Sequence, residues 1–217
     1  MLLASKNAVV YGAGGSMGGA VARAFAREGA RVILAGRTLA KLDRVAREGR
    51  SIEMCFNAVG LNDVQGIPLA EDSLDDFLAP VVEGARTHFL TATAAARRMT
   101  AQGSGVIIML SPSAARASGP MMGGFSVACA AIECLTRTLA GEVGRHGVRV
   151  VALRPNRTPE TVPEVSPVDV QLLVDGTGLG RLPRLAEVAD TAAFLASDGA
   201  GAITGAVVNL TCGAVVD

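Results

Sequence analysis

Two serines and a histidine are the residues whose type and position best suit proton transfer in this sequence. Ser111 and Ser113 directly follow an apolar run, Val106 to Leu110, that predicts a buried strand. Side chains at the carboxyl end of a parallel strand border the crevice in which α/β sheets bind ligands. His88, one of only two histidines, lies in a preceding helical segment. We therefore expect Ser111, Ser113 and His88 to be catalytic; a hydrogen-bonded or partner-facing histidine is the alternative for His88.

A glycine-rich turn, YGAGGSMGG at positions 11–19, has the composition of a phosphate-binding loop. Glycines allow a tight turn, and they bring backbone N–H groups and the positive helix end against a pyrophosphate. A turn kept only for close packing of strand and helix is the alternative. The residues expected to contact a dinucleotide are Gly12, Gly14, Ser16, Met17 and Gly18, with Arg37 after the second strand for the 2′-phosphate of NADP.

The elements that must position these residues alternate between strand-like and helix-like patterns. The first three, Ala8–Gly12, Met17–Glu28 and Arg31–Gly36, form a β-α-β unit, the start of a parallel sheet. The further predicted elements are a helix at 38–48, a strand at 52–56, a helix at 75–99 interrupted near Pro80 and Gly84, a strand at 106–110, a helix at 124–143, a strand at 148–153, a helix at 185–196 and a strand at 207–210. The irregular segment at about 155–183 predicts a lid over the sheet, whose Asp169 and Asp175 are further candidate bases.

The composition indicates one globular domain, residues 1–217, and narrows the classes of partner. Half of the residues are hydrophobic, and 20 basic residues balance 20 acidic ones without a run of like charges. No apolar run reaches the ~18 residues that span a bilayer, and the first residues lack a secretory pattern. We therefore expect a cytoplasmic protein with a small-molecule substrate and with neither a nucleic-acid nor a membrane partner. The four cysteines lack C-x-x-C spacing, which argues against a metal site.

The order of the motifs resembles the short-chain dehydrogenase/reductase family over nearly the whole chain. Gly12 to Gly18 is similar to the family's TGxxxGxG turn, and Asn57-Ala58-Val59-Gly60 is similar to its NNAG turn. Residues 186–210 resemble its closing helix, turn and last strand. The resemblance implies an α/β fold with a single Rossmann-like, doubly wound parallel sheet, and it adds Asn57 and Ala58 to the expected cofactor-binding residues.

Two residues depart from the catalytic pattern of that family. Aligning the segment AAIECLTRTLAGEV puts Phe125 at the position of the family's tyrosine and Cys129 at that of its lysine. A phenyl ring has no titratable proton, and a thiol supplies no fixed positive charge. Tyr11 is the only tyrosine, and Lys6 and Lys41 are the only lysines, so no other alignment restores the pair. We expect Phe125 and Cys129 to form pocket walls instead.

A second departure is the short segment between the second strand and the NAVG turn. Arg37 and Asn57 are only 57 − 37 = 20 residues apart, whereas members of the family carry a longer segment there. We expect a sheet shortened by one strand and one helix after its second strand. Because the missing pieces would wall the adenine pocket, we also expect no cofactor, or only weakly bound NADP.

Three functions follow from these observations. The favoured one is a non-redox enzyme that uses the family's pocket for proton transfer, elimination, isomerisation or cyclisation of a small organic metabolite, aromatic or polyketide-like, in biosynthesis. The alternatives are a residual NAD(P)-dependent oxidoreductase and a non-catalytic subunit paired with an active relative. Small residues on the helices at 75–99 and 124–143 favour a homodimer or homotetramer, which resembles the family's four-helix interface.

Overall fold

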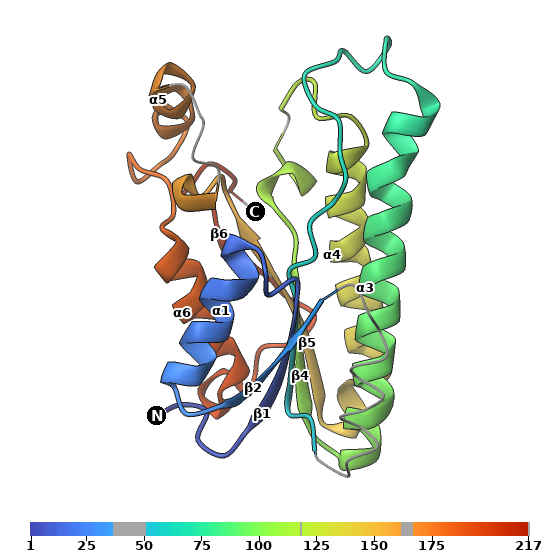
Figure 1. Cartoon of the computed structure of the whole chain (residues 1–217), viewed down its shortest axis with the longest axis vertical. Helices are drawn as coiled ribbons and strands as arrows, with labels where there is room; N and C mark the ends of the chain where they lie inside the picture. The colour runs from blue at the N-terminus through green and yellow to red at the C-terminus, as the bar shows by residue number, and fades with distance from the viewer. Residues whose placement is uncertain (37–50, 118, 162–166, 217) are drawn as a thin grey trace.

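The structure, a computed structural model, describes residues 1–36, 51–117, 119–161 and 167–216. The described strands form one parallel six-stranded sheet in the order β2-β1-β3-β4-β5-β6, shown in Figure 1. The strands are β1 (Asn7–Tyr11), β2 (Arg31–Ala35), β3 (Met54–Asn57), β4 (Gly105–Leu110), β5 (Val148–Pro155) and β6 (Val207–Leu210). The single parallel α/β sheet that the sequence predicts is thus confirmed.

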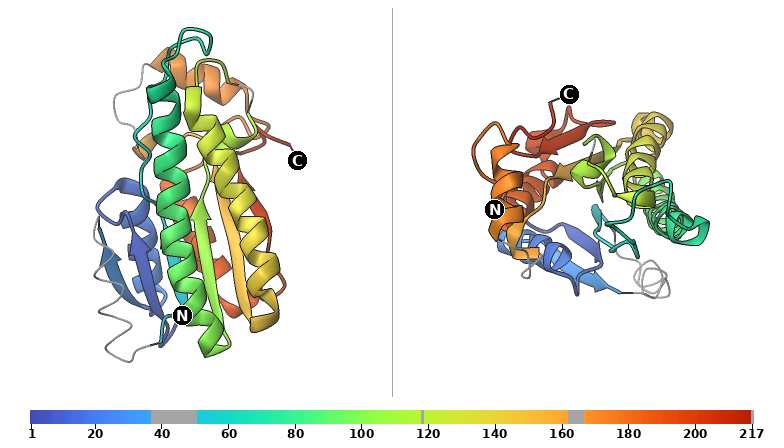
Figure 2. Two further views of the ribbon diagram at one scale, coloured as in Figure 1. Left: turned by 90° about the vertical axis from the view of Figure 1, so that its right-hand side faces the viewer. Right: turned by 90° about the horizontal axis from the view of Figure 1, so that it is seen from above.

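Two pairs of helices cover the two faces of the sheet. α1 (Ser16–Arg27) and α6 (Leu185–Ala196) pack on one face, and α3 (Leu74–Gln102) and α4 (Gly123–Val143) pack on the other (Figures 1 and 2). A further short helix, α5 (Pro167–Asp175), belongs to the segment between β5 and α6. The arrangement is the doubly wound architecture expected for parallel strands buried on both sides.

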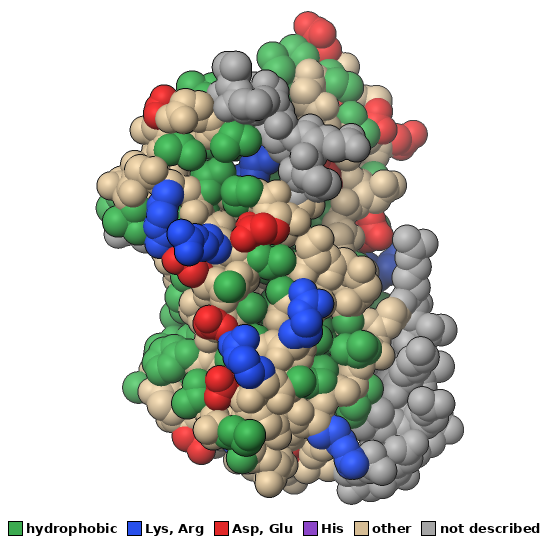
Figure 3. All heavy atoms as spheres, turned by 60° about the vertical axis from the view of Figure 1, so that its left-hand side comes forward, with side chains coloured by type: hydrophobic (Ala, Val, Ile, Leu, Met, Phe, Trp, Pro, Cys, Tyr) green, Lys and Arg blue, Asp and Glu red, His purple; other side chains and the backbone are tan. Residues whose placement is uncertain are grey.

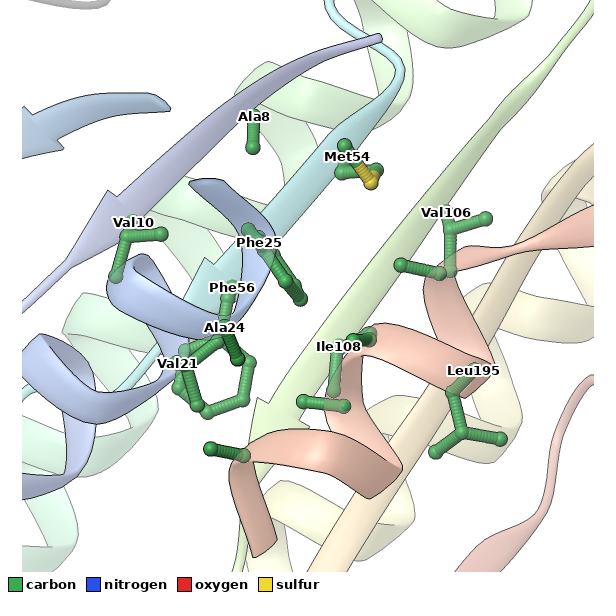
Figure 4. Close-up of a cluster of buried hydrophobic side chains, with 14 of the residues drawn as sticks. Ala8, Val10, Val21, Ala24, Phe25, Met54, Phe56, Val106, Ile108 and Leu195 are labelled. Carbon is green, nitrogen blue, oxygen red and sulfur yellow. The ribbon is translucent and has the colours of Figure 1, made fainter. Parts of the chain in front are cut away.

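Alternating residues along each strand build two separate cores, because successive side chains of a strand point to opposite faces. The core beneath α1 and α6 contains Val10, Phe56 and Ile108 with Phe25 and Leu195 from the helices (Figure 4). The rings of Phe25 and Phe56 meet edge to face, with centroids 6.5 Å apart. The opposite core, beneath α3 and α4, is built from the intervening strand residues, including Val9, Ile107 and Val150.

The strand order contains a switch point at the carboxyl edge of the sheet. From β1 the chain moves outward to β2 and then returns across β1 to form β3 on its other side. In open α/β sheets the ligand crevice lies at such a switch point, outside the carboxyl ends of the strands. In Figure 1 the α5 region and the segment at 58–73 rise above this edge on opposite sides.

The elements differ from the sequence-based predictions mainly along α3. The helix runs without interruption from Leu74 to Gln102, with Pro80 inside it. Pro80 lies near the start of the helix, where one hydrogen bond is lost, and the packing of α3 against α4 outweighs that loss. β2 is the edge strand of the described sheet, and the expected shortening after it stays a prediction. The predicted helix at 38–48 lies outside the described residues.

Charges of both signs are mixed on the surface formed by α1 and α6. Arg27 on α1 pairs with Asp190 on α6 at 2.5 Å, and Lys6 pairs with Asp198 at 2.6 Å. On the face drawn in Figure 3, basic and acidic side chains lie interspersed among apolar ones rather than gathered by sign. Within the described ranges, no helix has the combination of length and apolar character that crossing a membrane requires.

The first prediction concerns the close approach of α4 to α3. An ideal Cβ at Gly124 would lie 1.7 Å from the carbonyl oxygen of Phe77, so Gly124→Ala should force the helices apart and destabilise the fold by about 2 kcal/mol. Gly141, on the exposed side of the same helix, has no atom within 4 Å of its ideal Cβ. Gly141→Ala should therefore stabilise the protein by up to about 1 kcal/mol. Urea unfolding measures both changes, and equal effects at the two positions would contradict this packing.

Candidate functional site

The turn between β1 and α1 requires glycine at two positions. Gly12 has a φ of 71°, in the left-handed region, and an ideal Cβ there would lie 2.3 Å from the carbonyl oxygen of Ala58. An ideal Cβ at Gly18 would lie 2.4 Å from the carbonyl oxygen of Gly12. Both glycines therefore let the helix start directly against the end of the strand.

The opposite side of this turn is open and suits an anion. An ideal Cβ at Gly14 meets no atom within 4 Å. Gly15, the N-cap of α1, offers no side-chain hydrogen bond, and the first helical turn contains no acidic residue. The backbone N–H groups at Ser16 and Met17, at the positive end of the helix, can therefore serve a phosphate.

The turn after β3 braces the glycine turn. The Asn57 amide donates to Thr91 Oγ1 on α3 at 2.8 Å, and its carbonyl accepts the N–H of Val59 at 2.9 Å. The N–H of Ala58 donates to the carbonyl of Tyr11 at 3.1 Å. Asn57 and Ala58, expected at a cofactor site, thus join the carboxyl ends of β1 and β3 to each other and to α3, and their contact with a cofactor stays a prediction.

Ser113 and Asn156 meet at the carboxyl ends of β4 and β5. The Ser113 hydroxyl donates to Asn156 Oδ1 at 3.2 Å, and the same oxygen accepts the N–H of Arg157 at 2.8 Å. Both Ser113 and Asn156 are partly exposed. They therefore present a hydroxyl and an amide at the edge of the sheet where a ligand would bind.

Ser111, in contrast, is fully buried in a charged network. Its hydroxyl is 2.9 Å from the carbonyl of Cys129 and 3.3 Å from Glu133 Oε1. Arg154 donates to the same carboxylate through Nε at 2.7 Å and Nη2 at 2.9 Å. All three residues are at most 4% exposed. Ser111 therefore joins α4 to the ends of β4 and β5, and of the two candidate serines only Ser113 reaches the surface of the crevice.

Phe125 and Cys129 occupy one face of the start of α4. Phe125 is partly buried in the first turn, and Cys129 is fully buried one turn later. Burial raises the pKa of the Cys129 thiol to about 12, and the negative charges of Asp63 and Glu133 add to the shift. Cys129 is consequently a neutral, inert thiol at neutral pH.

His88 lies in the contact between α3 and α4. It is 1% exposed, and its Nδ1 is 3.0 Å from the carbonyl of Gly84, so Nδ1 carries the proton and donates. With Phe89, Ala131 and Ile132 it lines a cavity of about 330 Å³ between the two helices. Its surroundings are therefore the helix contact rather than the serines, and its catalytic role stays a prediction.

The remaining expected site residues lie in the lid or beyond the described chain. Arg37 is outside the described residues, as is the side chain of Asp169 in α5. Asp175 ends α5, where its carboxylate accepts the amide of Gln171 at 2.7 Å.

Comparison with known proteins places the fold and the site in one family. The chain matches the family model described as enoyl-(acyl carrier protein) reductase over residues 39–214. It is 32% identical over 243 residues to a galactitol 2-dehydrogenase (L-tagatose-forming) of Cereibacter sphaeroides, covering 96% of this chain and 94% of the relative. The chain belongs to the short-chain dehydrogenase/reductase superfamily. It is also 30% identical over 234 residues to L-xylulose reductase of Bos taurus, covering 95% of each chain.

Solved structures confirm the short-chain dehydrogenase/reductase fold. A gluconate 5-dehydrogenase from Burkholderia cenocepacia J2315, solved in complex with NADP and tartrate, superimposes with a TM-score of 0.88 at 21% identity, covering 97% of this chain and 95% of the other. A short-chain type dehydrogenase/reductase from Mycobacterium ulcerans gives a TM-score of 0.89 at 23% identity, covering 99% of this chain and 91% of the other.

These comparisons correct the expectation that the chain carries no cofactor or only weakly bound NADP. The relatives are named as dehydrogenases and reductases, and one protein of the same fold was solved with NADP. The expectation gave too much weight to the short 37–57 segment beside β2. The turn between β1 and α1, where the pyrophosphate is expected, is open at Gly14.

Four residues at or beneath the crevice were missed by the sequence reasoning. Glu133 and Arg154 interrupt otherwise apolar runs, IECL and VVALRP, and a charge in such a run was the signal that could have revealed them. Asn156 and Asp63 gave no comparable signal, because their contacts depend on how separate loops meet.

The second prediction concerns the pH dependence of stability through His88. Burial lowers its pKa from the ordinary 6.5 to about 4, so the unfolded state binds more protons between these two pH values. Stability should therefore fall as the pH drops from about 6.5 to about 4, by about 3 kcal/mol from this group alone. Urea unfolding of His88→Asn should lack that part of the pH dependence, whereas a His146→Asn control should retain it. Identical pH profiles for His88→Asn and the unchanged protein would disprove the assignment.

Proposed function

We propose that this short-chain dehydrogenase/reductase binds NADP or NAD at the glycine turn and catalyses proton transfer on a small organic substrate, without the phenol-to-lysine relay of its family. The observation that carries the proposal is the pair Phe125 and Cys129 on the crevice side of α4. A phenyl group and a buried thiol with a pKa of about 12 can neither give nor take a proton at neutral pH. The reaction class is proton transfer, elimination, isomerisation or cyclisation.

The glycine turn supports the cofactor part of the proposal. Gly14 leaves its surface free of side chains, and the first turn of α1 presents N–H groups at Ser16 and Met17 without competing acidic residues. A bound dinucleotide supplies or accepts a hydride in oxidoreductases of this kind. In the proposed reaction the turn's task is to bind and orient the pyrophosphate.

Ser113 and Asn156 support the catalytic part. Because the Ser113 hydroxyl donates to Asn156 Oδ1, its lone pairs remain available to accept a hydrogen bond from a substrate. Asn156 holds that hydroxyl in one orientation, which is what a positioned acid or base needs. Phe125 supplies an apolar wall, which suits an aromatic or polyketide-like substrate better than a sugar.

The second candidate function is a residual NAD(P)-dependent oxidoreductase, and the names of the relatives favour it. In it, Ser113 or a water molecule would take the place of the missing phenol. Loss of a positioned acid costs about 10²–10⁴ in rate, so such an enzyme would be slow.

The third prediction separates these two functions. The protein is incubated with NADPH or NADH and a panel of aromatic and aliphatic ketones in D₂O, and both cofactor oxidation and deuterium incorporation next to the carbonyl are followed. We expect deuterium incorporation with reduction slower than about 1 s⁻¹, the low end of ordinary turnover. Reduction above that rate would establish the oxidoreductase and overturn the proposal.

Two serine variants test the residue assignment within that experiment. Ser113→Ala should lower deuterium incorporation by at least about tenfold. Ser104→Ala, at the opposite edge of the sheet and exposed, should leave it unchanged. Full activity of Ser113→Ala would move the chemistry away from the end of β4.

We also propose that the outer faces of α3 and α4 associate two copies of the chain. Leu78, Val82, Phe89 and Val127 are exposed apolar residues on these helices. Cavities of about 450 and 330 Å³ lie along α3, so the surface is uneven enough to interlock with a second copy. Contiguous exposed apolar surface of this kind marks interaction sites.

The fourth prediction tests this association by light scattering. The unchanged protein should give a homodimer or homotetramer at micromolar concentration. Phe89→Asp should shift it to a monomer, because a carboxylate would be buried without a partner. A control, Phe194→Asp, changes an exposed phenylalanine on α6 and should not alter the mass. A monomeric unchanged protein would refute the association.

A further inference from the structure

The loop after β3 is fixed to both helices on its side of the crevice. The N–H of Asn62 donates to the Glu83 carboxylate on α3 at 3.0 Å, and the N–H of Gly66 donates to the carbonyl of Met121 just before α4 at 2.9 Å. Leu61 packs against α3, since its side chain lies 3.1 Å from an ideal Cβ at Gly84. The loop therefore crosses the start of α4 in one defined position.

Asp63 lies in the middle of this anchored loop. Its side chain is half-buried, and Gln65 Nε2 donates to its Oδ2 at 2.5 Å. The next residue, Val64, places its carbonyl oxygen 3.3 Å from an ideal Cβ at Gly123, so Asp63 lies beside the first turn of α4. Its negative charge adds to the raised pKa of Cys129 one turn later. A carboxylate thus stands beside the residue that has replaced the family's lysine, on the β3 and β4 side of the crevice.

The strand order indicates which part of a dinucleotide would meet this loop. A pyrophosphate at the start of α1 lies at the switch point between β1 and β3. The adenosine half extends toward the end of β2, where side chains of such folds contact its ribose. The nicotinamide half must then extend the other way, past Asn57 and over β3 and β4. With strands about 4.8 Å apart, β4 lies only about 10 Å from β1, which is within reach of a nucleoside.

We propose that Asp63 binds the hydroxyl groups of the nicotinamide ribose. The inference rests on the proposed dinucleotide binding and adds the residue that holds its second sugar. A carboxylate has acceptor sites for two hydroxyl donors, and charge-assisted bonds of this type are short and strong. Glu133, the other carboxylate near Cys129, is occupied by Arg154 and buried. Gln65 would keep the Asp63 side chain in place for the sugar.

The fifth prediction uses two pairs of probes that differ in the second nucleoside. NADP⁺ contains the nicotinamide ribose and 2′,5′-ADP lacks it; NAD⁺ and ADP form the matching pair. Calorimetry gives the dissociation constants of the four probes. It is carried out on the unchanged protein, on Asp63→Asn and on a control at an exposed residue, Asp75→Asn. Asp63→Asn should weaken NADP⁺ or NAD⁺ at least about tenfold, the size of a lost charge-assisted hydrogen bond. The dissociation constant of 2′,5′-ADP or ADP should stay within about twofold of its value for the unchanged protein. Asp75→Asn should leave the dissociation constants of all four probes unchanged.

Each outcome has a distinct meaning. Equal weakening of the long and short probes would show that Asp63 only holds the loop, and unchanged NADP⁺ binding would show no role; either result overturns the inference. If the unchanged protein binds none of the four probes, the proposed dinucleotide binding fails, and the inference fails with it.

Discussion

The buried ion pair between Glu133 and Arg154 is the constraint on which the carboxyl edge of the sheet depends. Removing two charges from water costs several kcal/mol per ion, and the cost is offset only when geometry and further hydrogen bonds are good. Here the carboxylate meets two guanidinium nitrogens and the Ser111 hydroxyl. Because the three residues come from α4, β5 and the end of β4, this one contact fixes the three elements relative to each other. Ser113 and Asn156 follow Ser111 and Arg154, respectively, by two residues. The network therefore also fixes where the Ser113 and Asn156 side chains meet.

A different constraint, the absence of side chains, shapes the other half of the crevice. Gly12 lets the carbonyl of Ala58 approach the end of β1, and Gly18 lets α1 begin against that turn. These contacts are made by backbone atoms, so they are insensitive to the identity of neighbouring side chains. The glycine turn before α1 and the start of α4, where Phe125 and Cys129 lie, are separate parts of the fold, and one can change without the other.

The sequence predicted the regular elements well because their signals are local. The bounds of α6 and β6 agree with the apolar periodicity residue for residue, and β4 and α4 begin within one residue of the expected positions. The expected break at Pro80 was wrong because the contact of α3 with α4 is a tertiary effect that propensity does not contain. Asn156 and Asp63 depend on the meeting of separate loops, and Ser111 could not be told from Ser113 until burial distinguished them. The cofactor expectation failed because it counted residues missing beside β2 rather than the contacts kept at the glycine turn.

The two ends of the crevice carry opposite electrostatic character. At the glycine turn, the start of α1 favours negative charge. Around Cys129 the chain offers a neutral thiol and the carboxylates of Asp63 and Glu133. The charge of Glu133 is balanced by Arg154 at 2.7 Å, whereas Asp63 Oδ2 accepts a hydrogen bond from the neutral amide of Gln65. An alkoxide formed from a ketone would be repelled at that place, whereas a hydroxyl donor or a developing positive charge would be stabilised. Burial and the two nearby carboxylates together keep the Cys129 thiol neutral, so Cys129 itself supplies no positive charge to the oxyanion that carbonyl reduction requires.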